Sequence, residues 1–233
     1  MNFLTEKAFE LAKTGVFTYT DALVWLGGTR NSVRSKIMRA VDSGEIVHIR
    51  RGLYCLAKPY NRVGISRNML ANLIYGPSYI SFETALSFHG WIPEAVHSVS
   101  SVSLGRARTF EMPLGYFDYV QIKQASLLAG VVRITGERES EGSYYMAKPL
   151  KAVADYVAAR GLDWTGVEPL VESLRIEEEN LESLSAADFD ELDGVYKSAR
   201  ARKLLAGLRK ELGTRMVRER AREGQSHASD GGH

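Results

Sequence analysis

Two groups of arginines near the N-terminus have the residue types and spacing to bind an anionic polymer. In "TRNSVRS", residues 29–35, Arg30 and Arg34 stand one helical turn apart among short polar residues. Such side chains on an exposed helix can hydrogen-bond to base edges in the major groove of DNA. In "IRRGLY", residues 49–54, Arg50 and Arg51 precede Gly52, which supplies the flexibility of a turn. A turn does not need two guanidinium groups, so we predict that this pair contacts phosphates or a narrow minor groove.

The elements around these arginines predict a winged helix-turn-helix over residues 1–58. Helical spacing in 3–13, the capping-box pattern "TYTD" at 18–21 and the stop "GGT" at 27–29 indicate two helices and a three-residue turn. A third helix then buries one stripe and leaves a polar face, and a hairpin over 45–56 follows it. The buried stripe consists of Val33, Ile37, Ala40 and Val41.

This arrangement would place the third helix in the major groove and the hairpin beside the same duplex. The predicted DNA contacts are Thr29, Arg30, Asn31, Ser32, Arg34, Ser35, Arg39, Arg50 and Arg51. The alternative is an ordinary helical domain with a basic, solvated surface, because basic clusters often serve only that purpose.

Downstream signals predict a mixed α/β domain over residues 62–222, so the fold class is α+β. "SYISFETALSFHG" indicates a short strand and a helix capped by Ser81, and "HSVSSVSLG" and "YFDYVQIKQ" indicate strands. "GVVRITGERESEGSYYMA" indicates a hairpin, and from Pro149 the pattern is helical to about Arg222. The polar, glycine-rich residues 223–233 are predicted to be a disordered tail.

Charge is nearly balanced over the 233 residues, with 30 basic and 28 acidic side chains, but it is unevenly distributed. Residues 163–193 contain eleven acids and one base, and residues 197–223 contain ten bases and three acids. A stripe of Leu204, Leu208, Leu212 and Met216 predicts that the basic helix docks on the second domain. Its basic face can pair with the acidic stretch, extend the DNA contact or serve the antitoxin activity, and the second use is our expectation. The candidate residues for DNA or partner contact are Arg202, Lys203, Arg209 and Lys210.

Composition argues against several other classes of protein. The single cysteine, Cys55, permits no internal disulfide, and no apolar run approaches the roughly 18 residues needed to span a bilayer. We therefore expect a cytoplasmic address. The five histidines show no metal-ligand spacing, and no phosphate-binding loop or nucleophile elbow is present in the sequence. We expect no enzyme activity, no catalytic residue, no metal and no cofactor.

Three separated blocks resemble the AbiEi family of bacterial antitoxin-repressors. The blocks are "GGTRNSVRSKIMRAVDSGEIVHIRRGLYCLAKP", "PSYISFETALSFHGWIPE" and "YYMAKPLKAVADYV", and together the resemblance spans about residues 5–160. It implies a type IV toxin–antitoxin system of abortive infection and phage defence. It further implies a repressor that binds inverted repeats in the double-stranded DNA of its own promoter. Its second domain would neutralise a nucleotidyltransferase-like toxin without a stable complex.

A different function remains open on the residues alone. A winged-helix repressor unrelated to any toxin could sense a small molecule through its α/β domain. Tyr79, Phe82, Phe88 and Trp91 could line such a pocket, although aromatic residues at helical spacing more often form a core. Release from DNA by a ligand would distinguish this alternative from the antitoxin.

Overall fold

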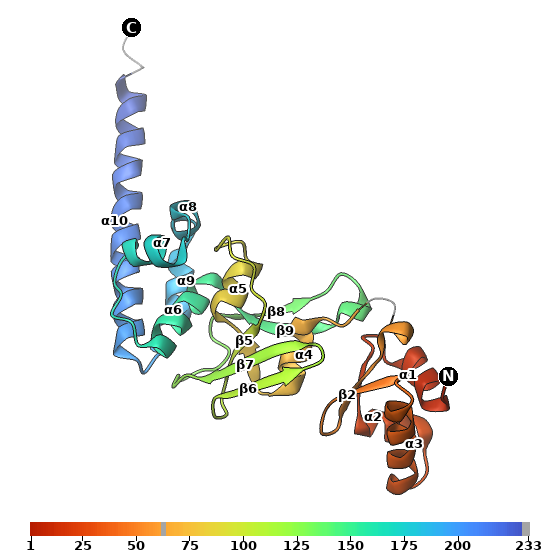
Figure 1. Cartoon of the computed structure of the whole chain (residues 1–233). Coiled ribbons are helices and arrows are strands. Elements are labelled where there is room, and N and C mark those ends of the chain that lie inside the picture. Colours follow the sequence, from red (N-terminus) through yellow and green to blue (C-terminus); the bar gives the residue numbers. More distant parts are fainter. Residues whose placement is uncertain (62–63, 230–233) are drawn as a thin grey trace.

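The computed structural model describes residues 1–61 and 64–229, with side chains described up to residue 214. A small N-terminal domain is followed by a central sheet with helices packed on it and by a C-terminal helical part (Figure 1). The winged domain lies at one end of the molecule, and the long last helix lies at the other. The predicted α+β class, with a winged helix-turn-helix before a mixed domain, is confirmed.

The N-terminal domain has the order helix, strand, helix, helix, hairpin. Its elements are α1 (Phe3–Leu11), β1 (Val16–Thr18), α2 (Tyr19–Leu26), α3 (Arg30–Asp42), β2 (Ile46–Arg50) and β3 (Leu53–Leu56). The predicted capping box is present, because Thr18 and Asp21 each accept a hydrogen bond from the other's backbone N–H. Strand β1 was not predicted, and it pairs antiparallel with β3 to complete a sheet of order β1-β3-β2.

The winged domain has a small apolar core of its own. The predicted stripe of α3 faces it, since Val33, Ile37 and Ala40 are buried and Val41 packs at its edge. Leu4 of α1 and Phe17 of β1 are buried in the same cluster. The opposite face of α3 is consequently left to solvent.

The central part of the chain forms one mixed sheet in the order β6-β7-β5-β4-β9-β8. Its strands are β4 (Ser78–Ile80), β5 (Val99–Ser103), β6 (Arg108–Met112), β7 (Gly115–Gln121), β8 (Val131–Thr135) and β9 (Ser143–Ala147). The parallel pairs are β4 with β9 and β5 with β7. Short 3-10 turns lie at Lys58–Tyr60 and Glu139–Glu141.

Two helices among the strands cover this sheet. α4 (Arg67–Ile74) packs against β4, β5 and β9, whereas α5 (Phe82–Phe88) packs against β5 and α6 (Pro149–Arg160). All three residues of β4 are buried, so both faces of the sheet are covered at its centre. Neither α4 nor β6 was predicted from the sequence, while the predicted strands of β4, β5, β7, β8 and β9 are all present.

The C-terminal part is helical, as predicted, but it is divided into five helices. They are α6 (Pro149–Arg160), α7 (Glu168–Leu174), α8 (Glu178–Glu182), α9 (Ala186–Glu191) and α10 (Ala199–Ser229). The stripe Leu204, Leu208 and Leu212 of α10 is buried, so this helix docks as predicted, and Met216 lies outside the described side chains. Of the predicted tail 223–233, the helix as described includes residues up to Ser229, and residues 230–233 lie outside the described part.

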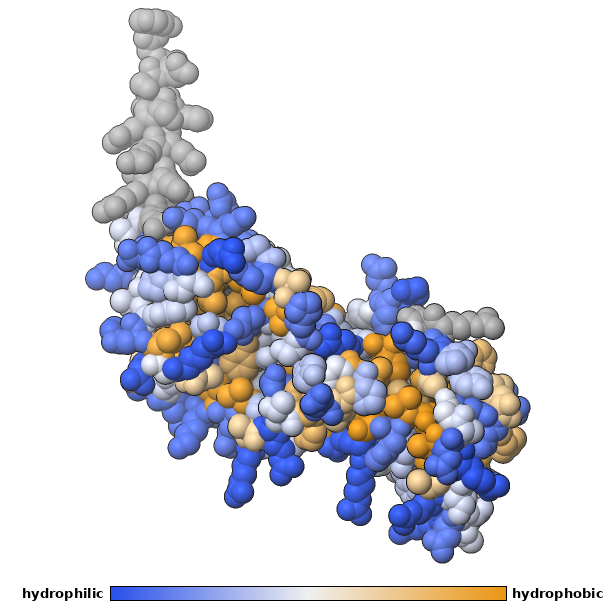
Figure 2. All heavy atoms as spheres, viewed as in Figure 1, coloured by the Kyte–Doolittle hydropathy of each residue, from blue (hydrophilic) through white to orange (hydrophobic). Residues whose placement is uncertain are grey.

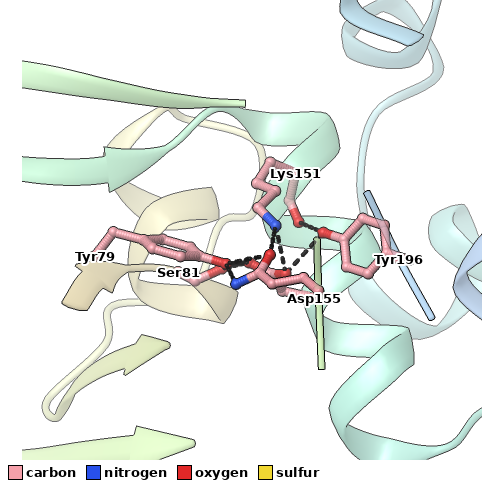
Figure 3. Close-up of polar contacts among 6 residues, drawn as sticks. Tyr79, Ser81, Lys151, Asp155 and Tyr196 are labelled. Carbon is pink, nitrogen blue, oxygen red and sulfur yellow. Dashed lines mark hydrogen bonds and ion pairs between the residues drawn. The ribbon is translucent and has the colours of Figure 1, made fainter. Parts of the chain in front are cut away.

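A fully buried ion pair on α6 lies at the centre of the second domain (Figure 3). Lys151 Nζ is 3.2 Å from Asp155 Oδ1, one turn along the helix, and both side chains have no exposed surface. The Asp155 carboxylate also accepts hydrogen bonds from Ser81 Oγ at 2.7 Å, Tyr79 OH at 2.9 Å and Tyr196 OH at 2.7 Å. These donors come from β4, from the start of α5 and from the segment before α10, so one carboxylate ties three parts of the chain to α6.

Burial sets the protonation of the groups around this carboxylate. It raises the pKa of Tyr79 and of Tyr196 above the ordinary value, so both phenols keep the proton that they donate. It lowers the pKa of Lys151, and the neighbouring Asp155 opposes that shift. Ser81 is the N-cap residue of α5 as predicted, but its hydroxyl makes no capping bond and donates to Asp155 instead.

We expect Asp155→Asn to lower the free energy of unfolding by about 3–5 kcal/mol, because it leaves the Lys151 ammonium buried without a counter-charge. Urea denaturation at pH 7, followed by circular dichroism, measures this change. Asp163→Asn is the matched control, since Asp163 pairs with Lys203 at an exposed site and should have only a small effect on the free energy of unfolding. Equal effects of the two substitutions would contradict a central role for the buried pair.

Candidate nucleic-acid interface

Helix α3 is presented to solvent along its polar face. Thr29 precedes it, and its hydroxyl accepts a hydrogen bond from the Ser32 backbone N–H at 3.3 Å. Tyr19 of α2 donates its hydroxyl to the Arg30 carbonyl at 3.0 Å, which fixes the first turn of α3 on α2. All the residues predicted on this face are exposed, namely Thr29, Arg30, Asn31, Ser32, Arg34, Ser35 and Arg39.

The structure brings part of the predicted set together in one groove between α3 and the β2–β3 hairpin. The groove has a volume of about 930 Å³. Its walls carry Arg30 and Arg34 from α3 and Arg51 from the hairpin, and none of its eleven lining residues is acidic. The lining residues are Tyr19, Arg30, Asn31, Arg34, Ile37, Met38, Val41, His48, Arg51, Gly52 and Tyr54. A concave surface with three guanidinium groups suits a polyanion.

Two other predicted residues are held differently. Arg39 lies outside the groove and folds back along its own helix, with Nε donating to the Ser35 carbonyl at 3.3 Å. Arg50 also lies outside the groove, and its guanidinium donates to the Ile74 carbonyl of α4 in the second domain. The adjacent arginines of the hairpin therefore point to different places, and only Arg51 faces the groove.

Sequence reasoning missed the aromatic part of the groove. The ring of His48 lies 5.2 Å from the ring of Tyr54, and the two stand opposite each other on β2 and β3. Burial and the nearby Tyr19 raise the pKa of Tyr54, whereas Arg34 opposes this shift. Tyr54 therefore remains a neutral hydroxyl that can donate to a phosphate or base. Strand alternation was the available signal, because His48 and Tyr54 lie on the strand face opposite the buried Ile49 and Leu53.

Hydrophilic residues cover the end of the winged domain that contains α3. Figure 2 shows hydrophilic residues over the lower end of the winged domain, where Figure 1 places α3.

The basic residues predicted on α10 are exposed too, but α10 lies at the opposite end of the molecule. Two of them are paired with the acidic stretch, with Lys203 Nζ 2.9 Å from Asp163 and Arg209 Nη2 2.7 Å from Asp190. This arrangement favours internal pairing over the expected extension of the DNA contact. The other two candidate residues, Arg202 and Lys210, are exposed on the same helix.

The aromatic residues considered for a ligand pocket do not gather around one. Tyr79, Phe82 and Trp91 are buried in the main core, while Phe88 is about half exposed at 48%. A separate polar hollow of about 570 Å³ lies between α5, α6 and the loop before β5. Two of its carboxylates are already in ion pairs, Glu83 with Arg160 and Glu94 with Arg175.

The described residues show little that resembles a metal centre or a membrane segment. No group of three or more His, Cys, Asp or Glu side chains among them is arranged to hold a metal ion. None of the helices in the described part of the chain is long and apolar enough to cross a membrane. Burial raises the pKa of the Cys55 thiol to about 12, so this cysteine is a poor nucleophile at neutral pH.

Comparison with known proteins identifies the N-terminal segment. Residues 6–57 match the model of a family described as transcriptional regulators, AbiEi antitoxin. The matched segment covers α1 through β3 and therefore all the residues of the groove. It confirms the resemblance for the winged domain and supports a role of this segment in DNA binding as a transcriptional regulator. No curated protein matches the chain.

If the basic face of α10 serves internal pairing, removing its charges should leave DNA binding unchanged. We expect Lys203→Ala and Arg209→Ala to lower the free energy of unfolding by less than about 1 kcal/mol each, because both ion pairs are exposed. The dependence of DNA affinity on salt should stay the same, which fluorescence anisotropy with labelled duplex measures. A shallower salt dependence in these variants would instead place α10 in the DNA contact.

Proposed function

We propose that this chain represses its own operon by binding inverted repeats in the promoter through the groove between α3 and the hairpin. The observation that carries the proposal is that Arg30, Arg34 and Arg51 line one groove without an acidic neighbour among its lining residues. The family match over the same residues supports it. In this arrangement α3 enters the major groove, and the hairpin tip with Arg51 follows the phosphate backbone beside it.

The two kinds of contact predict different mutational effects. Arg34 is on the helix that contacts bases, so Arg34→Ala should reduce the discrimination between operator and random DNA by about 1–3 kcal/mol. Arg51 is assigned to phosphate, so Arg51→Ala should weaken binding to both DNAs alike. It should also reduce the slope of log affinity against log salt by about 0.9 for each bound copy. The measurement is a salt titration of affinity for both duplexes.

Parallel loss of both affinities in the Arg34 and Arg51 variants would show that α3 does not contact bases. Lys36→Ala is a control within the same helix, because this side chain is half-buried and does not line the groove. A wild-type slope near zero would remove DNA binding from the proposal altogether.

We further propose that the second domain serves as the antitoxin of a nucleotidyltransferase-like toxin encoded in the same operon, without forming a stable complex. The resemblance of the blocks around β4–α5 and β9–α6 to antitoxin-repressors supports this role. Those blocks contain Ser81, Lys151 and Asp155, which hold the domain core together. Neutralisation would then depend on a domain that is separate from the DNA-binding groove.

Co-expression with the toxin gene of the operon tests this second role. We expect growth to be restored by the wild-type chain and equally by an Arg34→Ala, Arg51→Ala double variant, because both substitutions lie in the winged domain. The toxin should be expressed from an unrelated promoter, so that repression cannot protect the cell. Growth arrest in the presence of a folded, expressed wild-type chain would contradict the antitoxin proposal.

A further inference from the structure

The hairpin that carries Arg50 and Arg51 contains an irregularity that separates these two side chains. The register of β2 and β3 shifts between His48 and Arg50, so that Arg50 stands opposite Leu53. Successive side chains of a regular strand alternate between its faces, and a bulge redirects the side chain that follows it. Arg50 is thereby turned toward the second domain, whereas Arg51 faces the groove.

The Arg50 guanidinium meets the C-terminal end of a helix. Its Nη1 donates to the carbonyl of Ile74, the last residue of α4. The final carbonyls of a helix have no partner within the helix, and the negative end of the helix dipole lies there. A cation placed at this end satisfies an acceptor and is attracted by the dipole, so Arg50 caps α4 from another domain.

The surroundings of this contact are rigid and aromatic. Tyr119 of β7 donates its hydroxyl to the Ala71 carbonyl of α4 at 2.6 Å, and its ring packs 5.2 Å from that of Tyr75. Arg108 of β6 lies over the ring of Tyr75, 5.7 Å from its centroid. Burial raises the pKa of Tyr119, and the charge of Arg50 opposes this shift, which is consistent with their closeness.

Apolar contact accompanies the hydrogen bond. Ile49 and Leu53, which flank the hairpin tip, are buried, with 8% and 5% of their surfaces exposed. They belong to the core cluster of the second domain, together with Leu70 and Ile74 of α4, and not to the small core of the winged domain. One side of the hairpin tip therefore belongs to the same apolar core as α4, while its other side lines the groove.

We propose that Arg50 is a positioning residue that fixes the winged domain on α4, so that both domains approach DNA as one body. This inference rests on the proposed DNA binding by the α3 groove. Arg50 acts through Arg51 and α3, because it holds the hairpin that presents them, and it makes no phosphate contact itself. A hairpin released from α4 would have to be ordered again on binding, which lowers affinity without removing any charge–phosphate contact.

The test compares Arg50→Met, Arg50→Lys and Arg51→Ala in the full-length chain. Methionine keeps an unbranched apolar side chain against the hairpin but removes the donor, and lysine restores a cationic donor. Spin labels at Glu6→Cys in α1 and Glu172→Cys in α7, both exposed, report the distribution of distances between the domains. The buried Cys55 should not react with the label. Operator affinity is measured over a range of salt concentrations, and circular dichroism checks that each variant is folded.

We expect Arg50→Met to broaden the distance distribution and weaken operator binding with an unchanged salt slope. Arg50→Lys should restore both the narrow distribution and the affinity. Arg51→Ala should leave the distances as they are and reduce the slope by about 0.9 for each bound copy. If Arg50→Met does not fold, Arg50→Gln decides, because it removes the charge. A phosphate contact would then lose part of the salt slope, whereas a positioning residue leaves the slope unchanged.

Two results would overturn the proposal. In the first, Arg50→Met or Arg50→Gln reduces the salt slope of operator affinity as much as Arg51→Ala does, while the distances between the spin labels stay unchanged. Arg50 would then be a phosphate contact. The second is an unchanged distance distribution together with unchanged affinity. If instead neither Arg34→Ala nor Arg51→Ala affects DNA binding, the proposed function fails. A broadened distribution in Arg50→Met would then still support the positioning of the hairpin.

Discussion

The second domain depends on keeping one carboxylate and one ammonium out of water at the same time. Removing both charges from solvent is costly, and their attraction offsets that cost only when the remaining hydrogen-bonding capacity is satisfied. Asp155 meets this condition with two phenols and a serine hydroxyl in addition to Lys151. Because these partners come from distant parts of the sequence, the charge pair requires β4, α6 and the segment before α10 to assemble together.

This requirement has a visible consequence in the backbone beside the pair. Phe82, directly after Ser81, has φ 56°, a value that is unfavourable for a bulky residue. Its side chain is buried in the main core, with 5% of its surface exposed, and the Ser81 hydroxyl is committed to Asp155. Burial on one side and a charge-assisted hydrogen bond on the other thus hold a conformation that local propensity disfavours.

The sequence predicts the winged domain well because its signals are local. The capping box at Thr18, the buried stripe of α3 and the glycines at its ends each act within a few residues. The α4 contact of Arg50 could not be predicted in this way, because it depends on a bulge in the hairpin and on the carbonyl of Ile74, which lies 24 residues further along the chain. Likewise the sequence shows opposite charge blocks, but only the packing of α10 decides that Lys203 and Arg209 meet Asp163 and Asp190.

The arrangement of the molecule separates its two charged surfaces. The α3 helix that lines the groove lies at one end and α10 at the other, with the mixed sheet between them (Figure 1). Exposed charges farther apart than about 10 Å are largely screened at ordinary ionic strength, so the α10 charges act little on the groove directly. Any influence of α10 on DNA binding must therefore pass through packing. Among the described residues, the contact of the hairpin with α4 connects the second domain to the groove in this way.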